Sequence, residues 1–364
     1  MASIRVIVPC YNYARFLPGA VESALGQPGV DVSVLIIDDA STDNSAAVAE
    51  RLAQRDNRVE FIRHICNKGH IATYNEGLAS TQSDYVVLLS ADDLLTPGAL
   101  KRATDLMAAH PSVGLVYGHP IVFRDAEPLP SARTKRHTRT IWRGHDWVER
   151  MCRAGHNFIY CPEVVMRTTT QHRIGYYDPK LPHSGDMEMW LRAAAVSDIG
   201  RINGADQAYY RLHRSSMQRT VHKGAMIDLQ ARAAAFNSAL ARSGFLDAER
   251  LRDLAHSSIS VLALRELLAK LTCGHPAEIV DAEAYRAMAQ TIHPSVTSRP
   301  EWRKLERVLA DRTTSRGSTL ARLRHDVMSR LDWEYWRWSG LAWPAQGYQY
   351  RDFIRGSRNR QAMS

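Results

Sequence analysis

"LLSADDLLTP", residues 88–97, begins as an apolar strand and ends on two adjacent aspartates, Asp92 and Asp93. Burying one carboxylate costs free energy, and burying two side by side costs more unless a cation or a proton lies between them. One explanation is a strand end before a capped helix, with Asp93 or Thr96 as the cap before Pro97. The alternative is a site for Mg²⁺ or Mn²⁺, which bridges carboxylates to substrate phosphates. The surrounding sequence favours the metal and phosphate interpretation.

Short apolar runs recur through the first part of the chain. They cover residues 4–9, 32–38, 59–64, 85–90 and 113–118. Continuous hydrophobicity is typical of strands in a sheet that is covered on both faces. Helical spacing of apolar residues lies between the runs, as at 16–25 and after the capping residues 41–45. This alternation predicts an α/β fold whose mostly parallel sheet is flanked by helices.

Polar residues follow the first four of these runs, as "PCYN", "DDAST", "NKGH" and "SADD". In parallel sheets, ligands bind beyond the carboxyl ends of the strands, so these residues are candidates for a site. Asp38 and Asp39 could simply form a turn and a helix start. A carboxylate there could instead accept a hydrogen bond from a nucleobase imide or a ribose hydroxyl.

Composition limits the class of partner and compartment. The 364 residues carry a net charge of +9, which indicates an anionic partner: a nucleotide diphosphate, a phospholipid, an acidic protein or nucleic acid. Five scattered cysteines without C-x-x-C spacing favour free thiols in a reducing compartment. We find neither a signal peptide pattern nor 18 consecutive apolar residues. We therefore expect a cytoplasmic protein without a transmembrane segment, with peripheral membrane attachment as the alternative.

The composition changes after about residue 225, where segments rich in Ala, Leu and Arg predict amphipathic helices. We expect a catalytic domain at 1–224 and a helical domain at 225–364, used for oligomerisation or acceptor binding. The aromatic tail "DWEYWRWSGLAWP", residues 332–344, suits the interface of a homodimer. Contact with an anionic membrane surface is the alternative.

Five stretches together resemble the family 2 glycosyltransferases with the GT-A fold. They are "VIVPCYNYARFLPGAVESALGQ", "VLIIDDASTDNS", "NKGHIATYNEGLASTQSDYVVLLSADDLLTPGAL", "GDMEMWLRAAA" and "YRLHRSSMQ", in the family's order from about residue 3 to 220. The resemblance implies a Rossmann-like GT-A fold. It also implies inverting transfer from a UDP-sugar with the help of a divalent metal, Mg²⁺ or Mn²⁺.

The resemblance implies a role for each matching residue of the donor site. Pro9, Tyr11 and Asn12 would line the nucleotide pocket, Asp39 would bind uracil, and Asn67, Lys68 and Gly69 would close over the uridine. Asp93 would bind the metal, and Asp92 would hold the ribose or a metal-bound water.

The later stretches imply the catalytic groups. Asp186 matches the family's general base, with Glu188 as a weaker candidate, although Asp186 could be a helix cap and Glu188 could pair with Arg192 at i, i+4. His213 would be a metal or phosphate ligand and Arg211 a stabiliser of the leaving group. A lone histidine in a basic stretch is otherwise more often a solvated or core residue.

Two positions depart from the family pattern. Ser90 stands where many members have a further aspartate, which weakens the expected metal site and makes it rely more on UDP oxygens and on His213. Tyr74 stands where many members have an arginine, which removes a phosphate ligand that Lys68 or His70 could replace.

Several alternatives remain open from the sequence. The basic segment 132–143 is a solvated loop or a mobile loop that meets the diphosphate or an acidic acceptor. We expect a UDP-sugar and a soluble acceptor as partners, a small metabolite, a glycan or an intermediate on an acidic carrier protein, and no nucleic acid. The rivals are a catalytically weak sugar-nucleotide-binding scaffold and a transferase acting on lipid or polysaccharide at the membrane surface. A nucleotidyltransferase is disfavoured, because no glycine-rich loop follows the first strand.

Overall fold

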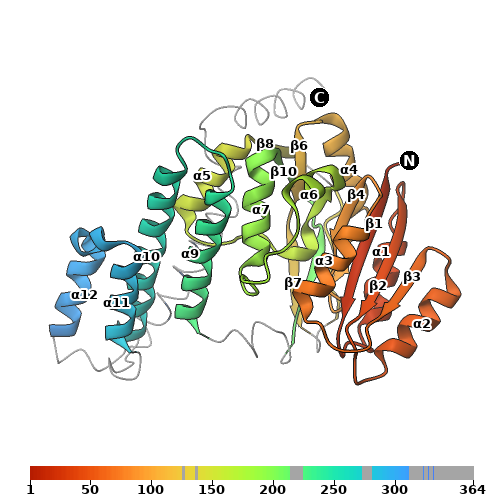
Figure 1. Ribbon diagram of the computed structural model, residues 1–364, viewed down its shortest axis with the longest axis horizontal. Coiled ribbons are helices and arrows are strands. Elements are labelled where there is room, and N and C mark those ends of the chain that lie inside the picture. The colour runs from red at the N-terminus through yellow and green to blue at the C-terminus, as the bar shows by residue number, and fades with distance from the viewer. Residues whose placement is uncertain are drawn as a thin grey trace. The chain divides into compact units, whose positions relative to one another are not determined.

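The computed structural model describes residues 1–124, 128–135, 138–213, 224–272 and 281–310, with 323, 327 and 331 as single residues. These residues group into two compact units (Figure 1). The first unit contains Met1–Gly144 and the described residues of Ile159–Ser216. The second contains His145–Phe158 and the described residues of Met217–Trp343. The chain thus gives one helix to the second unit and then returns to the first.

The first unit is built on an eight-stranded mixed sheet with strand order β3-β2-β1-β4-β9-β6-β10-β8. Its strands are β1 Ser3–Cys10, β2 Asp31–Asp38, β3 Val59–Arg63, β4 Tyr85–Leu88, β6 Val113–Tyr117, β8 Thr138–Trp142, β9 Val165–Arg167 and β10 Asp198–Asn203. Only β9 and β8 run against the other strands of this sheet. The prediction of an α/β fold with a mostly parallel sheet is confirmed.

Helices cover both faces of this sheet. They are α1 Leu17–Leu25, α2 Ser45–Arg55, α3 His70–Ser80, α4 Ala99–Ala109, α6 Thr168–Ile174 and α7 Gly185–Val196. Alternate residues of β1 face opposite ways: Val6 and Val8 join the apolar cluster with α1 and α4, while Ile7 faces Gly77 of α3. This alternation explains the continuous apolar runs in the sequence.

A smaller sheet brings the segment that follows β4 together with a segment from much later in the chain. It has the order β5-β11-β7, with β5 Leu94–Leu95, β7 Pro120–Arg124 and β11 Ala208–Leu212. The β5 strand follows Asp92 and Asp93 directly and pairs with Ala208 and Tyr209. The pairing places residues 211–213 beside the two aspartates, although more than a hundred residues separate them in the chain.

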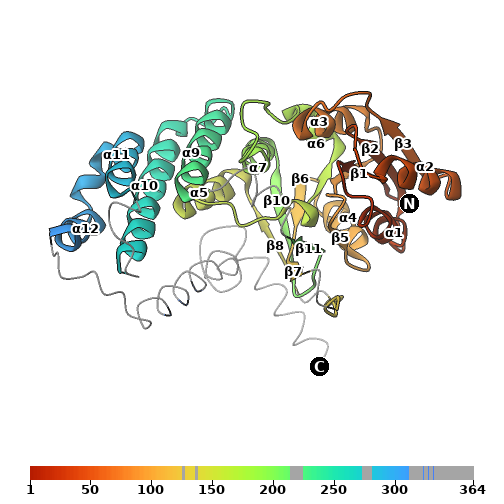
Figure 2. The same cartoon turned by 90° about the horizontal axis from the view of Figure 1, so that it is seen from below.

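The second unit is helical, as the sequence predicts. It contains α5 Gly144–Ala154, α9 Ala225–Ala241, α10 Ala248–Thr272, α11 Ala282–Ile292 and α12 Pro300–Ala310. The long α10 contacts α9, α11 and α12, which lie beside it in Figure 2. In the ranges that the structure describes, no helix is long and apolar enough to cross a bilayer.

Two sequence interpretations need comment here. The expectation of a loop across 132–143 is wrong for Thr138–Trp142, which form β8 and pair with β10. Its Thr-Arg-Thr-Ile-Trp sequence is rich in β-formers, and Thr140 and Ile141 are buried despite the nearby charges. The aromatic tail, residues 332–344, lies outside the described residues, so the dimer interface stays a prediction.

Candidate active site

The two aspartates after β4 are held by the end of β11. The backbone N–H of Arg211 donates to Asp93 Oδ1 at 2.8 Å, and the Arg211 Nε donates to the carbonyl oxygen of Asp92 at 2.7 Å. His213 Nε2 lies 2.8 Å from Asp92 Oδ2. The structure therefore brings together four of the sequence-predicted site residues from two distant segments.

The two carboxylates form a buried concentration of negative charge. Burial raises the pKa of Asp93 well above its ordinary value, and the neighbouring charge of Asp92 raises it further. Arg211 opposes this rise only in part. The Arg211 guanidinium lies over the rings of both Phe16 and Phe123, at 4.6 and 4.5 Å from their centroids. A bound cation would offset the charge that remains.

Aromatic rings fix the imidazole of His213. Phe16 lies 5.3 Å and Tyr13 5.7 Å from His213 between ring centroids, with Tyr13 edge-on. The His213 ring is buried, and its bond to Asp92 orients the edge that carries Nε2. His213 is therefore an ordered component of the site and not a solvated residue of a basic loop.

The donor atoms fit a divalent metal, but as an incomplete ligand set. Mg²⁺ and Mn²⁺ favour carboxylate oxygens and accept further oxygens from phosphates. Asp92 and Asp93 supply such oxygens. Within the residues that the structure describes, no group of three or more His, Cys, Asp and Glu side chains could hold a metal ion. The metal roles of Asp93 and His213 thus stay predictions that require additional ligands from the diphosphate.

Asp39 organises the loop that was expected to close over the uridine. Its Oδ1 accepts from the backbone N–H of Lys68 at 2.8 Å, and its Oδ2 accepts from the N–H of Gly69 at 2.9 Å. Asn67 donates its side-chain amide to the Asp39 carbonyl oxygen at 3.1 Å. His64 Nδ1 lies 2.7 Å from Asp39 Oδ1. Burial alone would raise the pKa of Asp39, but these hydrogen bonds outweigh it and lower the pKa.

Two further members of this network, His64 and Glu76, were not predicted from the sequence. His64 Nε2 lies 3.1 Å from Glu76 Oε2, and Lys68 Nζ bonds the same oxygen at 2.9 Å. His64 is buried and links Asp39 to α3. Its position as the last residue of the third apolar run, 59–64, is the signal that could have identified it, since polar residues also follow the neighbouring runs.

The loop after β1 has a mixed role. The side-chain oxygen of Asn12 accepts from the backbone N–H groups of Thr42 and Asp43, at 2.8 and 3.2 Å, so it fixes the loop before α2. Asn12 has a φ of 60°, a left-handed conformation that asparagine tolerates. Tyr11 is exposed, and Pro9 lies within β1, next to its last residue. Contact of these residues with a nucleotide stays a prediction.

Asp186 stands in the first turn of α7, where the helix dipole favours a carboxylate. The phenol of Tyr177 donates to Asp186 Oδ1 at 2.7 Å. Burial raises the pKa of Asp186, while Tyr177 and the charge of His70 lower it. A carboxylate with a raised pKa is a stronger base, which suits the predicted role.

Glu188 occupies a different environment. Its carboxylate is fully buried and bonds the Arg192 Nε at 2.9 Å through both oxygens. Arg192 also donates to the carbonyl oxygens of Ile174 and Tyr176. This pairing matches the i, i+4 alternative from the sequence and ties α7 to the segment before it. The geometry gives Glu188 a structural role, and its catalytic role stays a prediction that the ion pair disfavours.

Asp186 and the Asp92–Asp93 pair face some of the same side chains. Burial raises the pKa of Tyr210 and Cys161, and the charges of both Asp93 and Asp186 add to each rise. Tyr210 also packs against Tyr160 at 4.7 Å between ring centroids. The charges of the candidate base and of a candidate metal ligand thus act on the same two side chains of the first unit.

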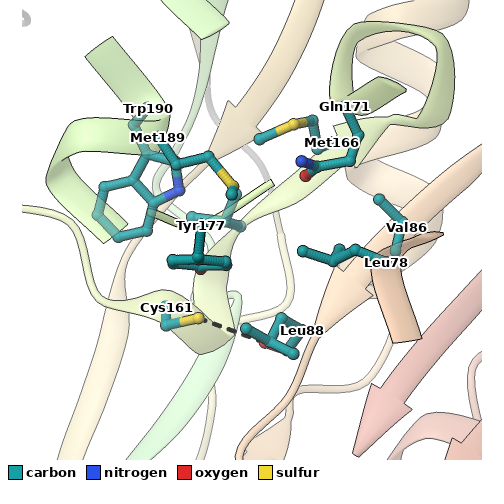
Figure 3. A pocket seen from close by; sticks show the side chains of 10 residues that line it. Leu78, Val86, Leu88, Cys161, Met166, Gln171, Tyr177, Met189 and Trp190 are labelled. Carbon is teal, nitrogen blue, oxygen red and sulfur yellow. Dashed lines mark hydrogen bonds between the residues drawn. The ribbon is translucent and has the colours of Figure 1, made fainter. Parts of the chain in front are cut away.

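A small cavity lies next to this region. It has a volume of about 20 Å³ and lies among Tyr177, Cys161, Leu88, Trp190 and other mainly apolar side chains (Figure 3). The Cys161 thiol donates to the Leu88 carbonyl oxygen at 3.5 Å. A cavity of this volume is too small for a sugar.

The fold is shared with solved structures of nucleotide-sugar enzymes. A structure described as Staphylococcus aureus TarS 1-349 in complex with UDP matches at a TM-score of 0.55 and 16% identity, covering 85% of this chain and 91% of that one. The mannosyltransferase PcManGT of Pyrobaculum calidifontis in complex with GDP-Man and Mn²⁺ matches at a TM-score of 0.50 and 19% identity, covering 84% and 86%. These matches confirm the predicted GT-A fold.

Sequence comparison relates the first half of the chain to one family. The sequence model of Glycosyl transferase family 2 matches residues 5–168. An uncharacterized glycosyltransferase of Nostoc sp. is 33% identical over 133 residues, which are 36% of this chain and 41% of that protein. Residues 5–168, somewhat less than half of the chain, are thus similar to glycosyl transferase family 2. The chain spans 31% to 43% of the lengths of three curated relatives, so the resemblance concerns the catalytic fold and not the whole of those proteins.

Proposed function

We propose that the chain transfers a sugar from a UDP-sugar to a hydroxyl or amine of an acceptor, with inversion at the anomeric carbon. One observation supports the proposal: the charges of Asp186 and of the paired carboxylates Asp92 and Asp93 all act on one tyrosine, Tyr210, whose pKa they raise beyond the effect of burial. Direct displacement needs the base and the diphosphate site to share one active site, because nucleophile and leaving group react at one carbon.

The proposed donor site is the edge of the sheet between Asp39 and Asp93. The Asp39 carboxylate makes three hydrogen bonds, two with the backbone N–H groups of Lys68 and Gly69 and one with His64. A carboxylate accepts about four, so one position is left for the imide of uracil. A divalent cation on Asp93, with Asp92 and His213 beside it, would neutralise charge on the departing diphosphate. Arg211 holds the backbone of Asp92 and so fixes the spacing of these groups.

The proposed proton acceptor is Asp186. It would take the proton of the acceptor's hydroxyl or amine as that group attacks from the face opposite the diphosphate. A positioned base contributes about 10²–10⁴-fold to such a reaction. Asp186→Asn should therefore abolish most turnover while leaving donor binding intact, because the amide keeps the shape and a hydrogen-bond acceptor for Tyr177.

The test compares donors and separates catalysis from binding. UDP-glucose, UDP-GlcNAc and GDP-mannose would each be incubated with Mn²⁺ or Mg²⁺, and nucleotide release and calorimetric binding would be measured. We expect release from a UDP-sugar and its loss in Asp186→Asn. Faster release from GDP-mannose would contradict the uracil assignment. Tight binding of every donor, with no turnover even after an extract that contains possible acceptors is added, would instead support a sugar-nucleotide-binding scaffold.

A further inference from the structure

We propose that Tyr177 is a positioning residue for Asp186, whose Oδ1 it holds by a hydrogen bond so that Oδ2 receives the acceptor's proton. The inference rests on the base role proposed above for Asp186. The Tyr177 hydroxyl lies 2.7 Å from Asp186 Oδ1, a short bond of the kind that a phenol donates to a carboxylate. None of the five stretches that identify the family contains Tyr177.

The backbone of Tyr177 is anchored to α3. The side-chain amide of Asn75 donates to the Tyr177 carbonyl oxygen at 2.9 Å, and the Tyr177 N–H donates to Asn75 Oδ1 at 2.8 Å. One side chain thus satisfies both backbone groups of Tyr177, and the residue is 5% exposed. The phenol is therefore presented from a fixed main chain and not from a mobile loop.

The ring of Tyr177 is held on two sides. Tyr74 packs against it edge-on, with ring centroids 5.5 Å apart, and Tyr74 in turn packs against His70 at 5.4 Å. On another side lies Gly185, where a Cβ atom would be 2.9 Å from Tyr177 Cδ1. Glycine at the start of α7 lets the ring reach the next residue, Asp186. Tyr74, the residue that departs from the arginine that the resemblance implies, takes part in this support.

The hydrogen bond also affects when Asp186 can act as a base. Burial raises the pKa of Asp186, and the Tyr177 phenol and His70 lower it. The other titratable groups that face Asp186 are Tyr74 of α3, Cys161 of the short helix Cys161–Glu163, and Tyr210 of β11. All three have a raised pKa and are neutral near pH 7, so none of them offers Asp186 a charge.

The test uses Tyr177→Phe, which keeps the ring and removes the donor. The adjacent Tyr176→Phe is the matched control. Carbon-13 NMR of aspartate-labelled protein, with Asp186→Asn to assign the resonance, follows the titration of Asp186 without any substrate. We expect the Asp186 midpoint to move to higher pH in Tyr177→Phe and to stay unchanged in Tyr176→Phe. An unmoved midpoint in a folded Tyr177→Phe would overturn the inference.

Kinetics supply the second measurement. With UDP-GlcNAc as the probe, we expect kcat to fall about 10-fold in Tyr177→Phe, a part of the 10²–10⁴ that a positioned base contributes. The KM for the donor should change little, and the acid limb of the pH profile of kcat should move to higher pH. A raised donor KM with unchanged kcat would overturn the positioning role. If Asp186→Asn is fully active, the proposed base is wrong, whereas an inactive Asp186→Asn with unchanged Tyr177→Phe refutes the inference alone.

Discussion

At the residue scale, the site depends on carboxylates whose burial is not fully compensated by protein groups. Asp93→Asn tests this. The amide keeps an oxygen for the Arg211 N–H but removes one of two adjacent charges. We expect turnover to fall by at least about 100-fold, because charge on the leaving diphosphate loses its counterion. Thermal stability without metal or donor should stay equal or rise, since Asp92 no longer faces a second carboxylate.

The control for this variant is Asp105→Asn on α4, where an exposed carboxylate pairs with Lys101 at 2.8 Å. Surface pairs contribute little, so this variant should match the wild-type protein in both measurements. A large loss of melting temperature in Asp93→Asn, or retained turnover, would contradict a cation site at Asp93.

His64 is the second residue whose role can be tested. It is buried between Asp39 and Glu76, and its loss would leave Asp39 with one donor fewer. We expect His64→Ala to lower the free energy of unfolding by about 1–3 kcal/mol, the typical cost of a buried polar group without its partner. The donor KM should rise as well, because Asp39 positions residues 67–69.

Chemical denaturation and donor titration measure both effects of His64→Ala. His172→Ala, which removes an exposed histidine from α6, is the matched control and should change neither. If His64→Ala loosened the fold without any change of donor KM, the network would be structural and unrelated to the nucleotide.

At the element scale, α3 connects core packing to the site. Gly77 faces the sheet, and a Cβ atom there would lie 2.5 Å from Ile7 Cγ2 and 3.2 Å from Ile37 Cδ1. Helix propensity alone favours alanine over glycine by about 1 kcal/mol. Overpacking costs about 1–3 kcal/mol, so we expect Gly77→Ala to be destabilising on balance. Because α3 also carries Asn75, a displaced helix should lower turnover too.

Ala72→Gly on the exposed side of α3 is the comparison. It should cost about 1 kcal/mol from propensity alone and leave the donor KM and kcat unchanged. Urea denaturation gives both values. A stabilised Gly77→Ala protein would mean that α3 can move away from β1 without penalty.

The elements also show why part of the fold was predictable. Continuous apolar runs identified β1, β2, β4 and β6 because strands buried on both faces allow few other residues. The antiparallel β9 was not predicted, since its three residues, Val165–Arg167, are too few to show a period. The strand β8 was concealed by the arginines around it. Local pattern thus succeeds where burial is complete and fails where pairing alone defines the element.

The site shows the same division. Asp92, Asp93 and His213 stand in motifs, so the proximity of these three followed from the resemblance and from strand order. Tyr177 and Asn75 lie 102 residues apart and meet only through tertiary packing. Glu188 illustrates the converse, because a residue inside a motif turned out to be bonded to Arg192 in the interior. Groups that support a catalytic residue leave little trace in a single sequence.

At the scale of the whole molecule, the two compact units are not two consecutive pieces of the sequence, because residues 145–158 belong to the second unit. The expected boundary at residue 224 would leave α5 in the first fragment, whereas α5 packs with the second unit. Glu149 bonds Arg250 at 2.8 Å, His145 bonds Asp247 at 2.9 Å, and Gly155 lies against Ile259 of α10. On α5, Trp147 and Met151 are fully buried.

A fragment of residues 1–224 should therefore expose the apolar face of α5. We expect it to bind a hydrophobic dye and to aggregate, because an exposed apolar patch of this kind favours association. In a matched fragment, residues 145–158 are replaced by a Gly/Ser linker of equal length, which removes that face and should give a monomer that still binds UDP-GlcNAc. Analytical centrifugation and calorimetry compare the two. Equal solubility of both fragments would mean that α5 does not need α10, and aggregation of both would mean that the first unit depends on the helical unit for more than this helix.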